Sequence, residues 1–237
     1  MAAGDVVVAL RGVVKDYNGL RPLRVQALDL RQGQSLALLG FDAVMAEVLV
    51  NLITGANLPD SGEVRVFNRP TTEITNADDW VRTLDQFGLV SERAVLVDQF
   101  TVEQNLAMPL SLEIEEMSPA LRAQVRALAA DVSLPDEHLR IRTGELPAAS
   151  RLRLRLGRAL ALGPRVLLAE HPNAALSSEE APAFAADLAR IIDGREIAAL
   201  VLTADRTFAH AVADEVLTLE PATGALKASS GWRRWFS

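Results

Sequence analysis

The chain has 237 residues, 49% of them hydrophobic, which is enough apolar material for a sizeable core. Its formal net charge of −7 argues against a general nucleic-acid-binding protein. It contains no cysteine, which excludes disulfides and thiolate metal sites, and His138, His171 and His210 are scattered, so no metal site is expected. The first residues lack the features of a signal peptide and no apolar run is long enough to span a bilayer, so we expect a cytoplasmic protein.

Strand and helix signals alternate along the chain. Strands are expected at residues 6–10, 25–30, 35–39, 63–67, 88–91, 166–169, 198–203 and 216–220. Helices are expected at residues 43–54, 76–87, 150–162, 178–193 and 206–211. The polar stretch 101–142 has no strand signal and predicts a helical insertion, with helix starts at Thr101 and Ser118. The alternation predicts an α/β fold with a parallel sheet and right-handed crossovers.

Residues 36–55 have the apolar pattern of a strand, a loop and a helix that bind a nucleotide. Such a loop reads G-x-x-x-x-G-K-[ST], in which the lysine contacts phosphates and the hydroxyl holds Mg²⁺. Gly40 opens the loop, but Ala46 stands at the lysine position and Glu47 at the first hydroxyl position. A triphosphate would therefore meet carboxylates where it needs donors. The altered nucleotide loop comprises Gly40, Asp42, Met45, Ala46, Glu47 and Val48.

From about residue 6 to residue 220 the chain resembles the ATPase subunit of ABC transporters. The resemblance lies in the order of seven landmarks, at residues 15–17 (adenine-stacking loop), 40–63 (phosphate loop, its helix and the next turn), 101–110 (entry to the helical subdomain), 145–150 (signature), 165–172 (Walker B), 202–205 (switch) and 213–216 (last core strand). It implies an α/β ABC-type P-loop ATPase fold with a mixed β-sheet core, an N-terminal antiparallel β-subdomain and a helical subdomain insertion. The implied single domain covers residues 1–237, with the core and β-subdomain in 1–100 and 143–237 and the helical subdomain at about 101–142.

The segment at residues 151–156 is ambiguous. Leucine and arginine alternate there, which is typical of a strand, whereas the following residues and the stop at Gly163-Pro164 favour a helix. We predict a helix, in part because the resemblance places one after the signature.

The resemblance assigns roles to positions whose residues have changed. Glu170 takes the place of the aspartate that helps to hold Mg²⁺, and His171 that of the glutamate that polarises the attacking water. Ala204 replaces the switch histidine, and Glu92 stands at the glutamine that links the nucleotide to the transporter. Tyr17 keeps the residue type of its position, which stacks on adenine.

The signature position is altered as well. In the family this segment binds the γ-phosphate held by the opposite subunit through backbone N–H groups at a helix N-terminus. Proline has no N–H, and alanine methyl groups crowd the approach. The chain is therefore not expected to complete a partner's site. The residues at this position are Leu146, Pro147, Ala148, Ala149 and Ser150.

These changes predict a non-catalytic ABC ATPase homologue that acts as a structural or regulatory subunit. The resemblance implies a peripheral position on the cytoplasmic face of the inner membrane. It also implies two partners, an ABC permease transmembrane subunit and an ABC ATPase-like subunit in a homo- or heterodimer. No catalytic residue, cofactor or nucleic-acid partner is expected.

Two alternatives stay open. The first is a weak or unusual ATPase that binds ATP and Mg²⁺ and uses Glu170 and His171, with the missing lysine replaced by Arg93 or by the row Arg151, Arg153 and Arg155. The second is a cytosolic binding module without a transporter. A separate feature is the aromatic segment from Trp232 to Phe236, which predicts either a membrane or partner contact or a tail packed on its own domain.

Overall fold

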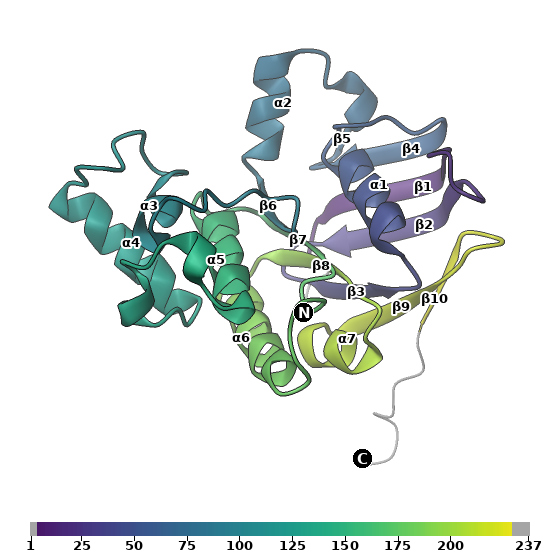
Figure 1. Ribbon diagram of the computed structural model, residues 1–237. Helices are drawn as coiled ribbons and strands as arrows, with labels where there is room; N and C mark the ends of the chain where they lie inside the picture. Colours follow the sequence, from purple (N-terminus) through teal and green to yellow (C-terminus); the bar gives the residue numbers. More distant parts are fainter. Residues whose placement is uncertain (1–3, 229–237) are drawn as a thin grey trace.

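The computed structural model describes residues 4–228, in which two β-sheets carry the helices (Figure 1). The larger sheet has the strand order β10-β9-β3-β8-β7-β6, and the smaller has the order β2-β1-β4-β5. Strands β3 and β6 to β9 run parallel, whereas β10 and the whole smaller sheet are antiparallel. The predicted α/β fold, with a mixed core sheet and an N-terminal antiparallel part, is confirmed. The aromatic segment from Trp232 to Phe236, for which two alternatives were given, lies outside the described residues.

The elements have the following bounds. The strands are β1 (Val6–Lys15), β2 (Leu23–Arg31), β3 (Ser35–Leu39), β4 (Ser61–Val66), β5 (Arg69–Pro70), β6 (Phe87–Val90), β7 (Val166–Glu170), β8 (Ala198–Leu202), β9 (Glu215–Glu220) and β10 (Ala225–Ala228). The α-helices are α1 (Ala43–Ile53), α2 (Ala77–Leu84), α3 (Val102–Ala107), α4 (Pro119–Asp131), α5 (Ala148–Leu160), α6 (Glu180–Arg195) and α7 (Arg206–Val212). Short 3-10 turns lie at Thr71–Glu73, Asp136–His138 and Thr143–Glu145.

The core sheet separates two apolar clusters. Successive side chains of a strand point to opposite faces, so each buried strand serves both. In β3, Leu36 and Leu38 join the cluster that contains α1 and the small sheet. Ala37 and Leu39 join the other cluster, which contains the residues of α3 to α6. All five residues of β3, β7 and β8 are buried, which is why these segments read as continuous apolar runs.

Helix α5 resolves the ambiguity at residues 151–156 in favour of a helix. The alternation arises because the helix packs on two sides, against β6 and against α3 and α4. Leu152, Leu154 and Leu156 are all buried, while Arg153 and Arg155 between them are only partly buried. Arg153 pairs with Asp187 of α6 at 2.6 Å. The helix begins at Ala148, ahead of the predicted residue 150.

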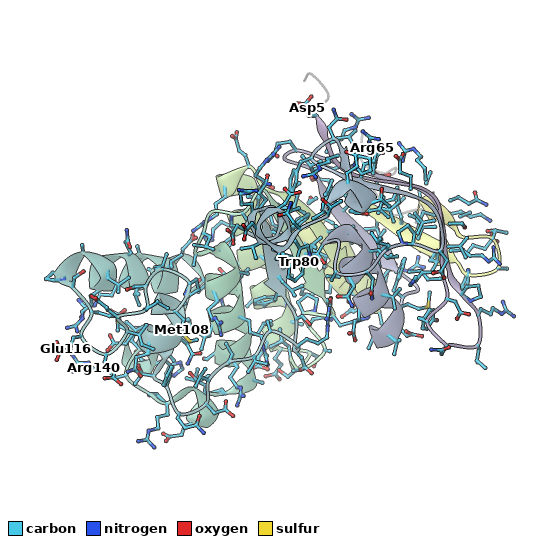
Figure 2. The ribbon with its side chains drawn as sticks, turned by 90° about the horizontal axis from the view of Figure 1, so that it is seen from above. Asp5, Arg65, Trp80, Met108, Glu116 and Arg140 are labelled. Atoms are coloured by element: carbon cyan, nitrogen blue, oxygen red, sulfur yellow. The ribbon has the colours of Figure 1, made fainter. Side chains whose placement is uncertain are left out.

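The insertion at residues 101–142 forms the end of the molecule away from the small sheet. Met108, Glu116 and Arg140 lie at this end, and Arg65 of the small sheet lies far from them (Figure 2). The predicted caps are confirmed: Thr101 closes a capping box at α3, and Ser118 caps α4 with proline at its start. No helix in residues 4–228 is long and apolar enough to cross a membrane.

Packing of α3 on α5 should carry much of the stability of this end. Leu106 is fully buried, and a Cβ placed on Gly157 would lie 2.7 Å from its Cδ2 atom. We expect Leu106→Ala to lower the free energy of unfolding by about 2–5 kcal/mol, because it opens a cavity in the core. Leu112→Ala is the matched control, since Leu112 is 98% exposed, and should change it by less than about 0.5 kcal/mol. Urea denaturation of both variants measures the difference, and equal losses would contradict this packing.

Candidate functional site

The loop after β3 is short and turns at Gly40. Its φ of +88° is in the region that favours glycine, and a Cβ there would lie 3.2 Å from the carbonyl oxygen of Leu219. Phe41 is buried, and α1 begins at Ala43. The retained glycine is therefore explained by the turn alone.

The N-terminus of α1 is capped by its own carboxylate. Asp42 Oδ1 accepts a hydrogen bond of 2.8 Å from the backbone N–H of Met45. Helix N-termini attract anions because their first N–H groups lack partners and the helix dipole is positive there. Asp42 supplies such an anion from within the chain. A phosphate at this end would have to displace Asp42 and approach its negative charge.

Some of the next side chains of α1 are buried in the core, and others are exposed to solvent. Ala46, at the expected lysine position, is fully buried, and Val48 is also buried. Met45 packs on the cluster beneath the small sheet. The side chain of Glu47 is 45% exposed and lies 3.5 Å from Arg93, a residue that follows β6. Position 46 therefore faces the core, and the cation nearest to this loop comes from another segment.

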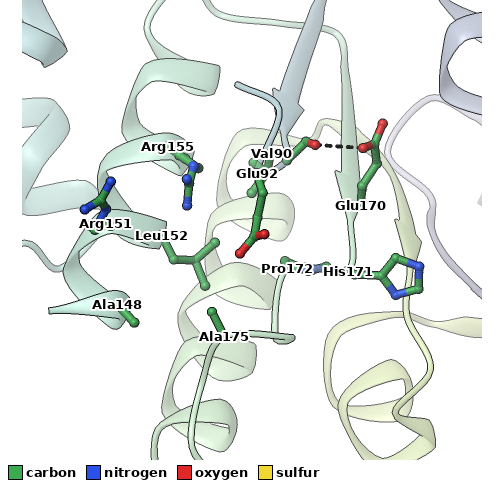
Figure 3. Close-up of a pocket in the computed structure, with 11 residues that line it drawn as sticks. Val90, Glu92, Ala148, Arg151, Leu152, Arg155, Glu170, His171, Pro172 and Ala175 are labelled. Atoms are coloured by element: carbon green, nitrogen blue, oxygen red, sulfur yellow. Dashed lines mark hydrogen bonds between the residues drawn. The ribbon is translucent and has the colours of Figure 1, made fainter. Parts of the chain in front are cut away.

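That cation is Arg93, which binds a buried carboxylate at the end of β7. Glu170 has a side chain only 8% exposed. It accepts hydrogen bonds from Ser91 Oγ at 2.7 Å (dashed in Figure 3), from Arg93 Nε at 3.1 Å and from Arg93 Nη2. Ser91 Oγ also accepts the backbone N–H of Arg93 at 3.1 Å, which fixes the turn after β6. Glu170 therefore has its partners supplied by a single short segment.

Arg93 also reaches the helix of the loop. Its Nη1 atom lies 3.5 Å from Glu47 Oε1. The hydrogen bonds from Arg93 to Glu170 raise the pKa of the guanidinium above its ordinary value, against the effect of burial, and the charge of Glu47 adds to the rise. The guanidinium is thus a fixed positive charge between two carboxylates of different elements.

His171 has an unusual backbone conformation, and in the described part of the chain its Nε2 atom has no hydrogen-bond partner. Its φ is +44°, rare for a residue with a side chain, and its N–H donates to the carbonyl of Leu202 at 2.8 Å. The Nε2 atom is buried. Figure 3 shows the ring directed away from Arg151 and Arg155. A histidine that acts as a base is normally positioned by a hydrogen bond from its second nitrogen, and no such bond is described here.

Two cavities meet at the ends of β6 and β7. One, of about 390 Å³, is bounded by the start of α1 and by residues 91–93, 170–171 and 174. The other, of about 320 Å³, lies toward α5 and includes Arg151 and Arg155 (Figure 3). Glu92 borders both. Burial lowers the pKa of Arg155, while the charge of Glu92 opposes this effect and that of Arg151 adds to it.

Of the signature and switch positions, Ala148 lines the cavity toward α5. Pro147 precedes α5 and makes no side-chain cap. Leu146 and Ser150 are buried, with Ser150 Oγ 3.0 Å from His138 Nδ1. Ala149 is partly buried beside them, and Ala204 is exposed in the turn before α7. That turn is held by a hydrogen bond of 2.8 Å from Thr203 Oγ1 to Asn173 Oδ1.

Tyr17 lies beside the capping carboxylate of the loop. It packs on the cluster beneath the small sheet, and a Cβ on Gly19 would lie 2.5 Å from its ring. Burial raises the pKa of Tyr17, and the negative charge of Asp42 raises it further. The tyrosine is therefore close to the loop, and its ring packs closely against Gly19 of its own segment.

The structure brings together some of the residues singled out in the sequence. Residues 47, 92, 170 and 171 meet around one cavity, with Asp42 at the start of α1. Sequence reasoning named Arg93 only as a candidate substitute for the lysine and missed Ser91 and the engagement of Glu170. A usable signal was present, because a carboxylate at the end of a fully buried strand requires a donor nearby.

Comparison with known proteins identifies the family. The sequence profile described as ABC transporter matches residues 23–174. The chain belongs to the ABC transporter ATP-binding family. The lipoprotein-releasing system ATP-binding protein LolD of Psychrobacter arcticus is 28% identical over 192 residues, covering 81% of this chain and 84% of LolD.

Other relatives and solved structures agree on the fold. The sulfate/thiosulfate import ATP-binding protein CysA of Thermosynechococcus vestitus is 27% identical over 90% of this chain, which spans 61% of that longer relative. The dimeric ABC transporter cassette MJ0796 superposes with a TM-score of 0.77 at 21% identity, covering 92% of this chain and 96% of that one. CbiO1 from Clostridium perfringens gives 0.79 at 18% identity, covering 94% and 87%. The ABC ATPase cassette fold is thereby confirmed.

The proximity of Tyr17 to Asp42 can be measured, because Tyr17 is the sole tyrosine of the chain. We expect the ultraviolet absorbance of tyrosinate to titrate above the ordinary value of about 10. The folded state holds this proton more tightly, so the associated stability is complete at neutral pH and is lost as the pH rises through the raised pKa.

Asp42→Asn should lower the pKa of Tyr17 while leaving the contribution of burial, which is the larger cause. Asp136→Asn is the control, since Asp136 is exposed in the helical insertion. A pKa of Tyr17 that does not respond to Asp42→Asn would place the two side chains too far apart to interact.

Proposed function

We propose that this chain is a non-catalytic member of the ABC ATPase family that serves as a structural or regulatory subunit of a membrane transporter. The observation that carries the proposal is the cap of α1. The carboxylate of Asp42 accepts a hydrogen bond from the N–H of Met45, which a phosphate bound at this helix N-terminus would need as a donor. Buried Ala46 and the Glu47 side chain stand where a lysine and a hydroxyl would complete the loop.

The rest of the site supports this proposal over the hypothesis of a weak ATPase. Arg93, the candidate replacement for the lysine, is engaged by Glu170 and Glu47. The carboxylate oxygens of Glu170 in turn accept hydrogen bonds from Ser91 and Arg93, which leaves this carboxylate poorly placed to bind another ion. The residues present therefore do not fit ATP with Mg²⁺, and no hydrolytic step is derived through them.

The proposed partners are a permease transmembrane subunit and an ABC ATPase-like subunit, with the chain bound to the cytoplasmic face of the membrane. The relatives include sulfate/thiosulfate import, phosphonates import and lipoprotein-releasing ATP-binding proteins, which is compatible with a place in a transporter complex. Loss of phosphate contacts leaves the surfaces outside the site available for such partners.

One surface suits a permease segment. A cavity of about 200 Å³ lies between the turn after β6 and the end of α5, lined by Phe87, Leu89, Ala94, Leu96, Pro109, Arg155, Arg158, Ala159 and Leu162. Next to it Val95 and Leu162 are 74% and 53% exposed. Apolar side chains gathered around a hollow are typical of a docking site for a short helix.

The proposal is tested by nucleotide binding. We expect isothermal titration calorimetry of the purified chain with ATP and MgCl₂ to give no saturable heat, and phosphate release to stay at background. Binding with a dissociation constant in the micromolar range would overturn the proposal and favour the weak ATPase.

Docking is tested by copurification of the chain with a permease whose gene lies next to its own. Val95→Asp places a charge at the rim of the cavity and should lower recovery of the permease about tenfold or more. Val81→Asp is the matched control, because Val81 is 49% exposed on α2, and should leave recovery unchanged. If both variants retain the permease equally, this surface is not the docking site.

A further inference from the structure

The donors that surround Arg93 have the composition of a site for a hard divalent cation. Glu170 presents both carboxylate oxygens, Glu47 presents one at 3.5 Å, and Ser91 contributes a hydroxyl bound to Glu170. Carboxylate and hydroxyl oxygens are the ligands that Mg²⁺ and Mn²⁺ take in proteins. Here they converge on a guanidinium.

We propose that Arg93 is a resident cation, which pairs with both Glu170 and Glu47 and ties helix α1 to strand β7 in the way that a bound divalent ion would. The inference deepens the proposed function and rests on it for its biological meaning. It adds that α1 and β7 keep the same relative arrangement whether or not metal or nucleotide is present.

Burial explains why such a cation is needed. The side chain of Glu170 is 8% exposed and closes a strand in which every residue is buried. An unpaired carboxylate there would bear a large desolvation penalty, which two hydrogen bonds from one guanidinium offset. Arginine suits this place better than lysine, because its planar group binds Glu170 with two nitrogens and reaches Glu47 with a third.

The geometry also explains why the cation comes from this segment. Ala46 is fully buried, so the first turn of α1 offers no room for a long cationic side chain at that position. Strand β6 pairs in parallel with β7, with Val90 opposite Ala169, so the residues after β6 emerge beside Glu170. Ser91 then fixes the backbone N–H of Arg93 and directs its side chain across the end of β7.

Thermal unfolding with and without metal tests the proposal, in the absence of nucleotide. In EDTA, Arg93→Gln should lower the Tm by about 5–10 °C, because it leaves Glu170 buried without its cation. Millimolar MnCl₂ should then raise the Tm of this variant by about 2–4 °C and leave the Tm of the unaltered protein within about 1 °C. Arg93→Lys, which keeps the charge, should stay insensitive to Mn²⁺.

The control is Arg65→Gln, which removes an exposed pair with Glu63 and should shift the Tm by about 1 °C or less, with no response to Mn²⁺. The proposal is overturned if the Tm of Arg93→Gln falls no further than that of this control or if Mn²⁺ fails to raise the Tm of Arg93→Gln. It is also overturned if Mn²⁺ raises the Tm of the unaltered protein by as much.

Should Arg93→Gln fail to fold, the double variant Arg93→Gln with Glu170→Gln decides. It removes cation and buried charge together, so it should fold and recover about half or more of the lost Tm. A double variant that does not fold overturns the proposal. These measurements need neither ATP nor a permease. A negative result therefore overturns the role of Arg93 alone, whereas the proposed function is tested separately by calorimetry and copurification.

Discussion

A buried carboxylate at the end of β7 is the constraint on which this site depends. Strand β7 lies between β6 and β8 with all five residues buried, so Glu170 cannot keep its charge without nearby donors. Parallel pairing with β6 delivers Ser91 and Arg93 to the same edge. The arginine also pairs with Glu47, and so links β7 to the helix of the loop.

The same edge combines a strand, a turn and a helix whose shape packing explains with acidic side chains at the helix N-terminus. The turn at Gly40 and the apolar face of α1 are explained by packing alone. What differs is the sign of the groups that the frame presents: Asp42 at the helix N-terminus and Glu47 one turn later are acidic. The positive charge that pairs with Glu47 lies on the segment after β6, at Arg93. The single charge of Arg93 thereby offsets part of the negative charge of Glu170 and Glu47.

The frame could be predicted from the sequence because its signals are local. Buried strands read as apolar runs, and the caps at Thr101 and Ser118 lie within four residues of the helices they start. The pairing of Arg93 with Glu170 could not be predicted, because it joins residues 77 positions apart and depends on β6 lying next to β7. Strand β10 was missed for another reason: it is short, lies at the sheet edge and has only partly buried or exposed side chains.

The segment between β6 and α3 has a mechanical consequence. One end carries Arg93, and the other is fastened to the helical end of the molecule by Asn105, whose buried amide bonds the carbonyl of Val97 and the hydroxyl of Thr143. A rigid shift of α3 and α4 would therefore pull on the residues that carry the guanidinium. Tension in this tether would reach Glu170 and Glu47 without passing through the sheet, so that a load applied at the helical end is felt at the loop.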